Sequence, residues 1–230
     1  MTPVVRLAIL TAAVVSAPVK RSAEEKALDA QNRPALEKMA EEAGRIAEMQ
    51  PKDGAAQYRA AAVYSLLAQL AIETGDKALG ASAAEAGIAA GKKAVALNGA
   101  NAEYRRILGT LCGQVIPANL MAALKHGKCA MEEVGKALEL DPKSSNAWMS
   151  RGVGNYYLPP AFGGGLNLAI DDFTRAVRLN PANPEAHLWL GIALRKAGRN
   201  AEARQAIQRS LELNPGRRWA RQQLEKTPPQ

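Results

Sequence analysis

The chain has 230 residues, of which 30 are basic and 22 acidic, so its formal net charge is +8. Alanine, leucine and long charged residues dominate, Phe occurs only twice, and no run alternates between apolar and polar residues. This composition favours helices and argues against a β-sheet protein. The length suffices for one repeat array or for two small domains.

The first residues have the pattern of an export signal. Arg6 precedes the apolar run 7–15, and small residues follow up to Ala17. These are the parts of a secretory signal peptide, and the run is shorter than the roughly 20 residues needed to span a bilayer. We therefore expect residues 1–17 to be a signal peptide and the protein to be periplasmic or secreted. Because Pro18 disfavours cleavage, an uncleaved membrane anchor is an alternative, as is a cytoplasmic protein with a wrongly assigned start.

A short sequence motif recurs five times after this segment. Each copy is an apolar helical stretch that ends in Asn, Asp or Gln, and the copies close at Pro51, Gly99, Pro142, Pro181 and Pro215. The spacings between the closing residues are 48, 43, 39 and 34. A period of 34 residues is typical of a repeat made of two antiparallel helices. The first three spacings exceed 34 by 14, 9 and 5 residues, and the surplus of 9 and that of 5 are predicted to lie between the two helices of their blocks.

The blocks follow one another in chain order. Residues 22–51 predict an N-terminal helix, from Pro34 to Met49, or half of a degenerate repeat. In the block 52–99 the first helix is expected from Ala55 to about Ile72, and the second is weakened by two glycines, each costing about 1 kcal/mol relative to Ala. The remaining expected units are repeats at 100–142, 143–181 and 182–215 and a capping helix at 216–226.

The last block carries the strongest pattern. Leu190 and Gly191 form a large-small pair in the first helix, Ala203 and Ile207 line the second, and His187 stands where such repeats prefer Trp. Small residues let the two helices approach closely, and large ones fill the space between pairs. Over residues 34–226 the chain resembles a tetratricopeptide repeat (TPR) protein. The resemblance implies an all-α, right-handed superhelix of antiparallel helix pairs with enlarged inter-helix loops and a C-terminal capping helix.

Two narrower resemblances are visible. The chain is similar to exported bacterial TPR proteins with long inter-helix inserts, and residues 111–142 are weakly similar to the regulator-of-microtubule-dynamics family. A microtubule role is not carried over to a chain that looks exported.

The TPR resemblance also implies a binding surface. In this family the first helices line a concave groove that holds a peptide or a helix of another protein. The lysine and asparagine set with which some members clamp a terminal carboxylate is absent, and a partner with acidic residues is expected to suit the groove. The groove residues are expected to be Arg106, Thr110, Asn146, Met149, Val153, Tyr156, Glu185, Leu188, Ile192 and Arg195.

The insert between the helices of block 143–181 is rich in large and stiff residues. If exposed, they form an apolar patch typical of binding sites, and if packed against the next repeat they extend its core. The following glycines lack the Lys-Ser/Thr of a phosphate-binding loop. The residues in question are Tyr157, Leu158, Pro159, Pro160 and Phe162, together with Tyr156 of the groove set.

Cys112 and Cys129 lie in one block. They could pair in an oxidising compartment and tie the two helices together, but we favour two small buried thiols because free Cys is among the most buried residue types. With His126 they make too sparse a set for a metal site. The second histidine, His187, is interpreted as a partly buried packing residue. No catalytic residue, cofactor or metal is therefore predicted.

Part of the excess of basic residues lies in residues 199–226, which contain seven basic and three acidic residues. Their helical spacing indicates a solvated face, and nucleic-acid binding is not favoured. We expect a non-catalytic scaffold that binds another protein in the cell envelope. The alternative is a transporter-associated protein with a small apolar ligand in a pocket closed by the inserts. The oligomeric state is open.

Overall fold

The computed structural model describes residues 20–116 and 120–229, without the side chains of residues 120–124 and 162. The predicted signal segment 1–17 lies outside these residues. In the described part every regular element is helical, which confirms the all-α class. The helices are α1 (Ala23–Asp29), α2 (Arg33–Met49), α3 (Gly54–Thr74), α4 (Lys77–Leu97), α5 (Ala102–Val115), α6 (Leu120–Leu140), α7 (Ser145–Tyr157), α8 (Leu166–Leu179), α9 (Pro184–Lys196), α10 (Asn200–Leu213) and α11 (Arg218–Glu225), with a 3₁₀ turn η2 (Pro160–Phe162).

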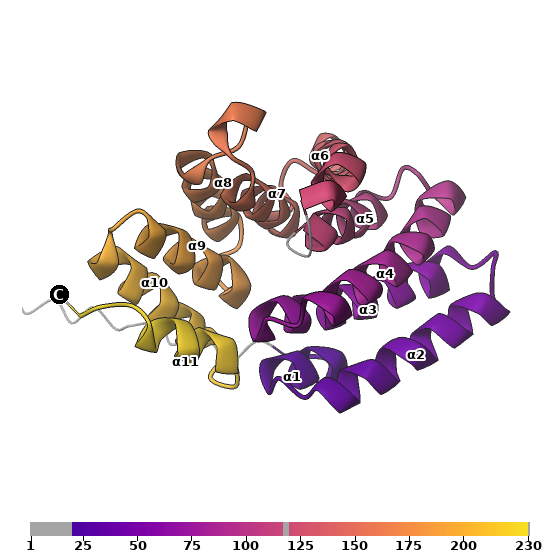
Figure 1. Ribbon diagram of the computed structural model, residues 1–230, viewed down its shortest axis with the longest axis horizontal. Helices are drawn as coiled ribbons and strands as arrows, with labels where there is room; N and C mark the ends of the chain where they lie inside the picture. The colour runs from indigo at the N-terminus through magenta and orange to yellow at the C-terminus, as the bar shows by residue number, and fades with distance from the viewer. Residues whose placement is uncertain (1–19, 117–119, 230) are drawn as a thin grey trace, which may run out of the picture.

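The helices form antiparallel pairs that follow one another around a closing arc (Figure 1). The pairs are α3 with α4, α5 with α6, α7 with α8, and α9 with α10, and the short α1 precedes α2 in the same way. We call the earlier member of each pair the first helix and the later one the second helix. The N-terminal region is thus a helix pair with a truncated first helix, rather than a lone helix.

The first helices begin in the same way. Just before each one, a side-chain oxygen accepts hydrogen bonds from backbone N–H groups of the first turn, which have no partner inside the helix. The residues are Asp53 before α3, Asn101 before α5, Ser144 before α7 and Asn183 before α9.

The surplus residues of the early blocks lengthen helices instead of enlarging loops. Aligned at its first residue, α3 with 21 residues is eight longer than α9 with 13. Helices α4 and α6 have 21 residues each, seven more than the 14 of α10. Only Gly75 and Asp76 separate α3 from α4. Gly75 makes this tight turn in the left-handed conformation, which is accessible to it because glycine has no Cβ. Within the described residues, the predicted enlarged loop is therefore found only between α7 and α8.

In α5, α7 and α9 a glycine at the middle of the first helix lies against the second helix. A Cβ on Gly152 would lie 2.6 Å from Cε1 of Phe173, and one on Gly191 would lie 2.9 Å from the carbonyl oxygen of Ala203. Gly109 is equally close to Val134, at 2.7 Å from its Cγ2. Such distances exclude a larger side chain, so the close approach inferred for Gly191 holds in three pairs.

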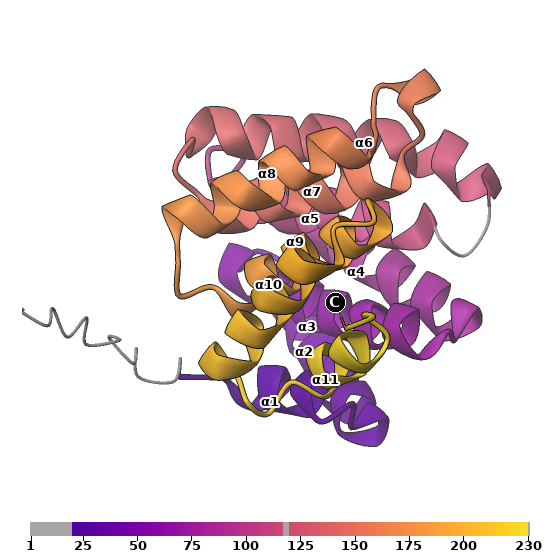
Figure 2. The ribbon, with the colours of Figure 1, turned by 90° about the vertical axis from the view of Figure 1, so that its left-hand side faces the viewer.

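Buried apolar residues form two large clusters. The N-terminal core joins α1–α5 and includes Leu28, Leu70 and Leu111. The C-terminal core joins α8–α11 and includes Phe173 and the indoles of Trp189 and Trp219. A small cluster around Val134 and Ala147 lies between α6 and α7. The two large cores are therefore separate, although the arc brings α11 back beside α1 (Figures 1 and 2).

Candidate interaction surface on the first helices

The first helices α5 and α7 share a polar strip. The Arg106 guanidinium donates to both carboxylate oxygens of Glu103, at 2.8 and 2.5 Å, and lies 3.4 Å from the hydroxyls of Thr110 and Ser150. The two hydroxyls are 2.9 Å apart. Tyr58 of α3 adds a hydrogen bond of 3.1 Å to Glu103. The predicted residues Arg106 and Thr110 are thus brought together with Ser150, which the sequence did not single out.

The charges in this strip are matched. Burial opposes the positive charge of Arg106, but the hydrogen bonds and charge of Glu103 outweigh it and raise the pKa of the guanidinium. Burial works against the Glu103 carboxylate in the same way, yet Arg106 holds its pKa below the usual value. Burial raises the pKa of Tyr58 to about 12. At neutral pH the strip therefore presents hydroxyl groups and a neutralised ion pair, not a free cation.

Asn146 continues the strip toward the next repeat. Its Oδ1 accepts a hydrogen bond of 3.0 Å from the buried amide of Asn183, and its own residue surface is exposed. Ser145 beside it donates to the carbonyl of Ala176 at 2.9 Å. The Asn146 side chain is therefore held by a hydrogen bond and is accessible from solvent.

The α9 part of the predicted groove is filled by the protein itself. Leu188 is fully buried and Ile192 is 5% exposed, both within the C-terminal core with Trp219 and Ala220 of α11. Arg195 donates to the backbone carbonyl and the side-chain oxygen of Gln223, at 3.0 and 2.7 Å. The expectation that Leu188 and Ile192 face an open groove is corrected, because both side chains are buried within the C-terminal core.

Met149, Val153 and Tyr156 of α7 take an intermediate place. All three are partly buried against the C-terminal core. The Tyr156 ring packs edge-on against Trp189, with the two ring centroids 5.9 Å apart. The ammonium of Lys196 on α9 lies 4.2 Å from the centroid of the Tyr156 ring. These three side chains are therefore partly in the core and partly at the surface.

The insert after α7 divides between core and surface. Tyr157 packs against Trp189 at a centroid distance of 6.3 Å but stays 44% exposed. Leu158 is half-buried, whereas Pro159 and Pro160 are exposed on the way into η2. The side chain of Phe162 lies outside the described part of the structure. The two alternatives for this segment therefore both apply, to different residues.

The other end of α9 takes part in a buried ionic cluster that the sequence did not predict. Arg217, fully buried, donates to Glu185 of α9 at 2.8 Å and to both carboxylate oxygens of Glu73 of α3. Its Nε lies 3.7 Å from Asp29 of α1. Arg21 pairs with the same aspartate at 3.2 Å. We call Asp29, Glu73, Glu185 and Arg217 the end-to-end junction, since they join the two ends of the array.

Burial and pairing oppose each other in this junction. Burial raises the pKa of Glu73, although Arg217 counteracts it, whereas for Glu185 the attraction of Arg217 outweighs burial and lowers the pKa. Arg217 itself is held charged by both carboxylates against its own burial. The sequence placed Arg217 on a solvated face, and this expectation is corrected. The sequence gives no local signal for the contact, because Glu73 is 144 residues away.

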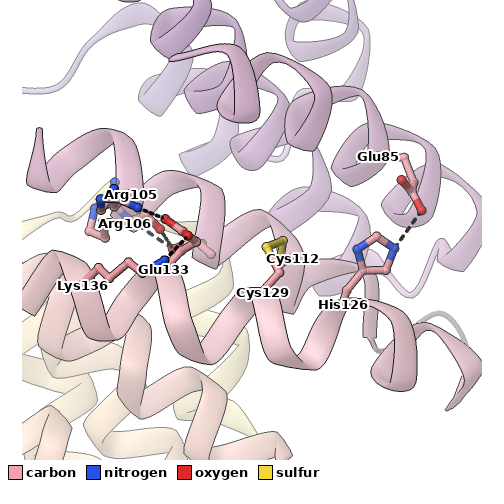
Figure 3. Close-up of a disulfide and its surroundings, with 9 residues drawn as sticks. Glu85, Arg105, Arg106, Cys112, His126, Cys129, Glu133 and Lys136 are labelled. Carbon is pink, nitrogen blue, oxygen red and sulfur yellow. Dashed lines mark hydrogen bonds and ion pairs between the residues drawn. A yellow bond between two sulfur atoms is a disulfide. The ribbon is translucent and has the colours of Figure 1, made fainter. Parts of the chain in front are cut away.

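Cys112 of α5 and Cys129 of α6 are bonded to each other, with Cα atoms 6.0 Å apart (Figure 3). The favoured expectation of two free thiols is therefore wrong for this structure. The pairing arises because antiparallel α5 and α6 place the two residues opposite each other. His126, one turn before Cys129, lies 3.1 Å from a carboxylate oxygen of Glu85 on α4 (Figure 3). Among the described residues no group of side chains has the arrangement of a metal site.

The repeat pattern and the fold can now be compared with known proteins. Residues 163–218 match the tetratricopeptide repeat family model. The chain contains tetratricopeptide repeats. The crystal structure of a thermophilic TPR protein from Thermus thermophilus superposes on this array with a TM-score of 0.64 at 18% identity, covering 89% of this chain and 98% of that one. This likeness shows the same fold.

A curated TPR relative matches part of the sequence. The small glutamine-rich tetratricopeptide repeat-containing protein 2 of Mycosarcoma maydis is 35% identical over 95 residues, which are 41% of this chain. The match spans only 25% of that relative. Within the described part of this TPR array, no helix is both long and apolar enough to cross a membrane.

Proposed function

We propose that this TPR protein is a non-catalytic scaffold that binds an extended peptide or a helix of another protein along the first helices. The polar strip on α5 and α7 carries the proposal. There Thr110, Ser150 and Asn146 offer hydroxyl and amide groups beside an ion pair that is already neutralised. Such groups suit the backbone and polar side chains of a peptide. The net charge of +8 favours an acidic partner through long-range attraction.

Photo-crosslinking tests this proposal inside the cell. A photoreactive residue replaces Asn146, on the first helix α7, or Asn167, an equally exposed asparagine on the second helix α8 of the same repeat. We expect a discrete crosslinked protein from position 146 and none from position 167. Asn146→Arg should then abolish capture of that protein while Asn167→Arg preserves it. Equal crosslinking from both positions, or full capture by Asn146→Arg, would contradict the proposed surface.

We further propose that the protein works in the periplasm or outside the cell. The composition of residues 1–17 supports export, and the bond between Cys112 and Cys129 suits an oxidising compartment. Intact-mass analysis of unreduced protein from separated cell fractions tests both points. We expect the envelope or medium fraction to hold a form two hydrogen atoms lighter than its reduced counterpart. Two free thiols in a cytoplasmic form would contradict the location.

A small-ligand function has one observation in its favour. A hollow of about 330 Å³ lies beside α1, with an apolar floor of Ala35, Met39, Ala43 and Ile46 on α2. Its size reaches the lower end of ordinary ligand sites. It lies on α1–α3, away from the α7–α8 insert that was expected to close such a pocket. Native mass spectrometry of the purified protein separates the two functions, because a retained small molecule would favour this alternative over the scaffold.

A further inference from the structure

The end-to-end junction exists because α3 is longer than a TPR first helix needs to be. Residues 67–74 extend past the length of α9, and Gln69 and Glu73 lie within this extension. Gln69 contacts Glu185 at 3.4 Å, and Glu73 binds Arg217. Gln31, in the turn between α1 and α2, joins the contact through its hydrogen bonds of 3.1–3.3 Å to Gln222 of α11.

The contact across the junction is almost entirely polar. Asp29, Glu73 and Glu185 surround Arg217, and the apolar clusters on the two sides do not merge. The helices on the two sides also have little direct backbone approach, in contrast to paired helices. Separating them would therefore expose few apolar groups and leave each core intact. This differs from an ordinary TPR contact, in which neighbouring pairs bury a continuous apolar core.

A buried ion pair of this kind specifies an arrangement more than it adds stability. Removing water from the charges costs free energy that their attraction only partly offsets. Without Arg217, by contrast, three carboxylates would share the site with Arg21 alone, and their mutual repulsion would oppose closure. The arrangement of the two ends thus depends on one side chain.

We propose that the end-to-end junction is a latch: Arg217 holds the two ends of the TPR array together, and its release opens the array without unfolding either half. Opening would expose the faces of α3 and α9 that carry Gln69, Glu73 and Glu185, and Glu185 belongs to the predicted binding surface. The latch would thereby control access to the α9 part of that surface. This last consequence rests on the proposed function, whereas the latch itself does not.

The test compares two neighbouring arginines. Arg217 is buried in the junction, and Arg218 at the start of α11 is exposed. Spin labels on cysteines replacing Lys77 and Glu225, both exposed near the junction, report its opening by double electron–electron resonance. The native cysteines are bonded to each other and remain unlabelled. We expect Arg217→Ala to shift the label distance to longer values with unchanged far-UV circular dichroism, and Arg218→Ala to match the parent protein.

An unchanged distance in a folded Arg217→Ala protein would overturn the latch. If that variant loses its helical signal, the decision passes to Glu73→Gln, which keeps the size of the side chain and removes one charge from the junction. A longer distance in this variant supports the latch, and the parent distance, or a loss of helix in this variant too, overturns it. Neither measurement uses a binding partner. The latch proposal can therefore be contradicted while the scaffold proposal stands, and the scaffold proposal can be contradicted while the latch proposal stands.

Discussion

At the residue scale, one hydrogen bond recurs through the array while the residue that makes it changes. Six positions after the closing residue, a side chain of the helix that follows donates back to that residue's carbonyl. Trp148 binds Pro142 at 2.8 Å, His187 binds Pro181 at 3.0 Å, and Arg105 binds Gly99 at 2.6 Å, with Arg221 and Pro215 making the same contact. What repeats is a donor that fixes each helix to the turn before it.

The substitution His187→Trp should therefore preserve the fold and remove a pH dependence. Burial lowers the pKa of His187 below 6.5, so the neutral ring donating through Nε2 is the folded form. Its stabilising effect is present above pH 6.5 and is lost as the pH falls through the lowered pKa. We expect urea unfolding to show a smaller loss of stability between pH 7.5 and 5.5 in the variant than in the parent protein. Equal losses would contradict this role of His187.

Two glycines of α7 should respond to alanine in opposite directions. At Gly152 an added Cβ meets the Phe173 ring, and overpacking of this kind costs about 1–3 kcal/mol. At the exposed Gly154 nothing lies within 4 Å of an added Cβ, and alanine should stabilise the helix by up to about 1 kcal/mol. Chemical denaturation of the two variants measures the difference. A stable Gly152→Ala protein would show that the α7–α8 pair has more room than the structure gives it.

At the element scale, the sequence predicted the helix pairs and the long first helix of block 52–99, but not the lengths of α4 and α6. The closing residues and the large-small pairs, such as Leu190 with Gly191, follow from local helix chemistry and could be read directly. The sequence did not show where the residues beyond 34 in each block would lie, because Gly87 and Gly91 suggested a weak second helix in the block 52–99. In the structure Gly87 is where Leu111 of α5 approaches, and Gly91 is packed against Leu108. The glycines serve packing between pairs, which only the folded array makes visible.

The disulfide between α5 and α6 should stabilise the array. Cys112 and Cys129 are 17 residues apart, and a closed loop of this size contributes about 3 kcal/mol by the chain-entropy estimate. We expect reductant to lower the thermal midpoint of the parent protein. The double variant Cys112→Ala, Cys129→Ala should start at the lower midpoint and not respond to reductant. If reductant leaves the parent midpoint unchanged, the bond carries no net stability.

At the scale of the whole molecule, the separate cores predict unfolding in more than one step. All three tryptophans, Trp148, Trp189 and Trp219, lie in the C-terminal half of the chain, whereas α1–α5 contribute to the helical signal without one. We expect the urea transitions seen by tryptophan fluorescence and by circular dichroism not to coincide, and to separate further in Arg217→Ala. If the two transitions coincide both in the parent protein and in Arg217→Ala, the two halves unfold together even when the junction is broken.

The end-to-end contact also marks the limit of reasoning from sequence. Arg217 looked like one more charge among the basic residues of the C-terminal segment, and Glu73 falls just after Ile72, where its helix was expected to end. Their contact depends on the curvature of the array, which sums the packing of every intervening pair. Arg106 and Thr110, in contrast, were both assigned from the repeat pattern to the groove face of one helix, and in the structure they lie one turn apart and within 3.4 Å of each other.

The seven-residue lengthening of α4 and α6 has a consequence for how such arrays vary. Seven residues make two turns of helix to within about 20°, so the packing face of the longer helix keeps its direction. The added reach is about 10 Å at 1.5 Å per residue. The length of a helix can thus change without changing how the repeats stack. Gains or losses of two turns could produce open or closed arrays from one stacking pattern, with no change in the residues between the pairs.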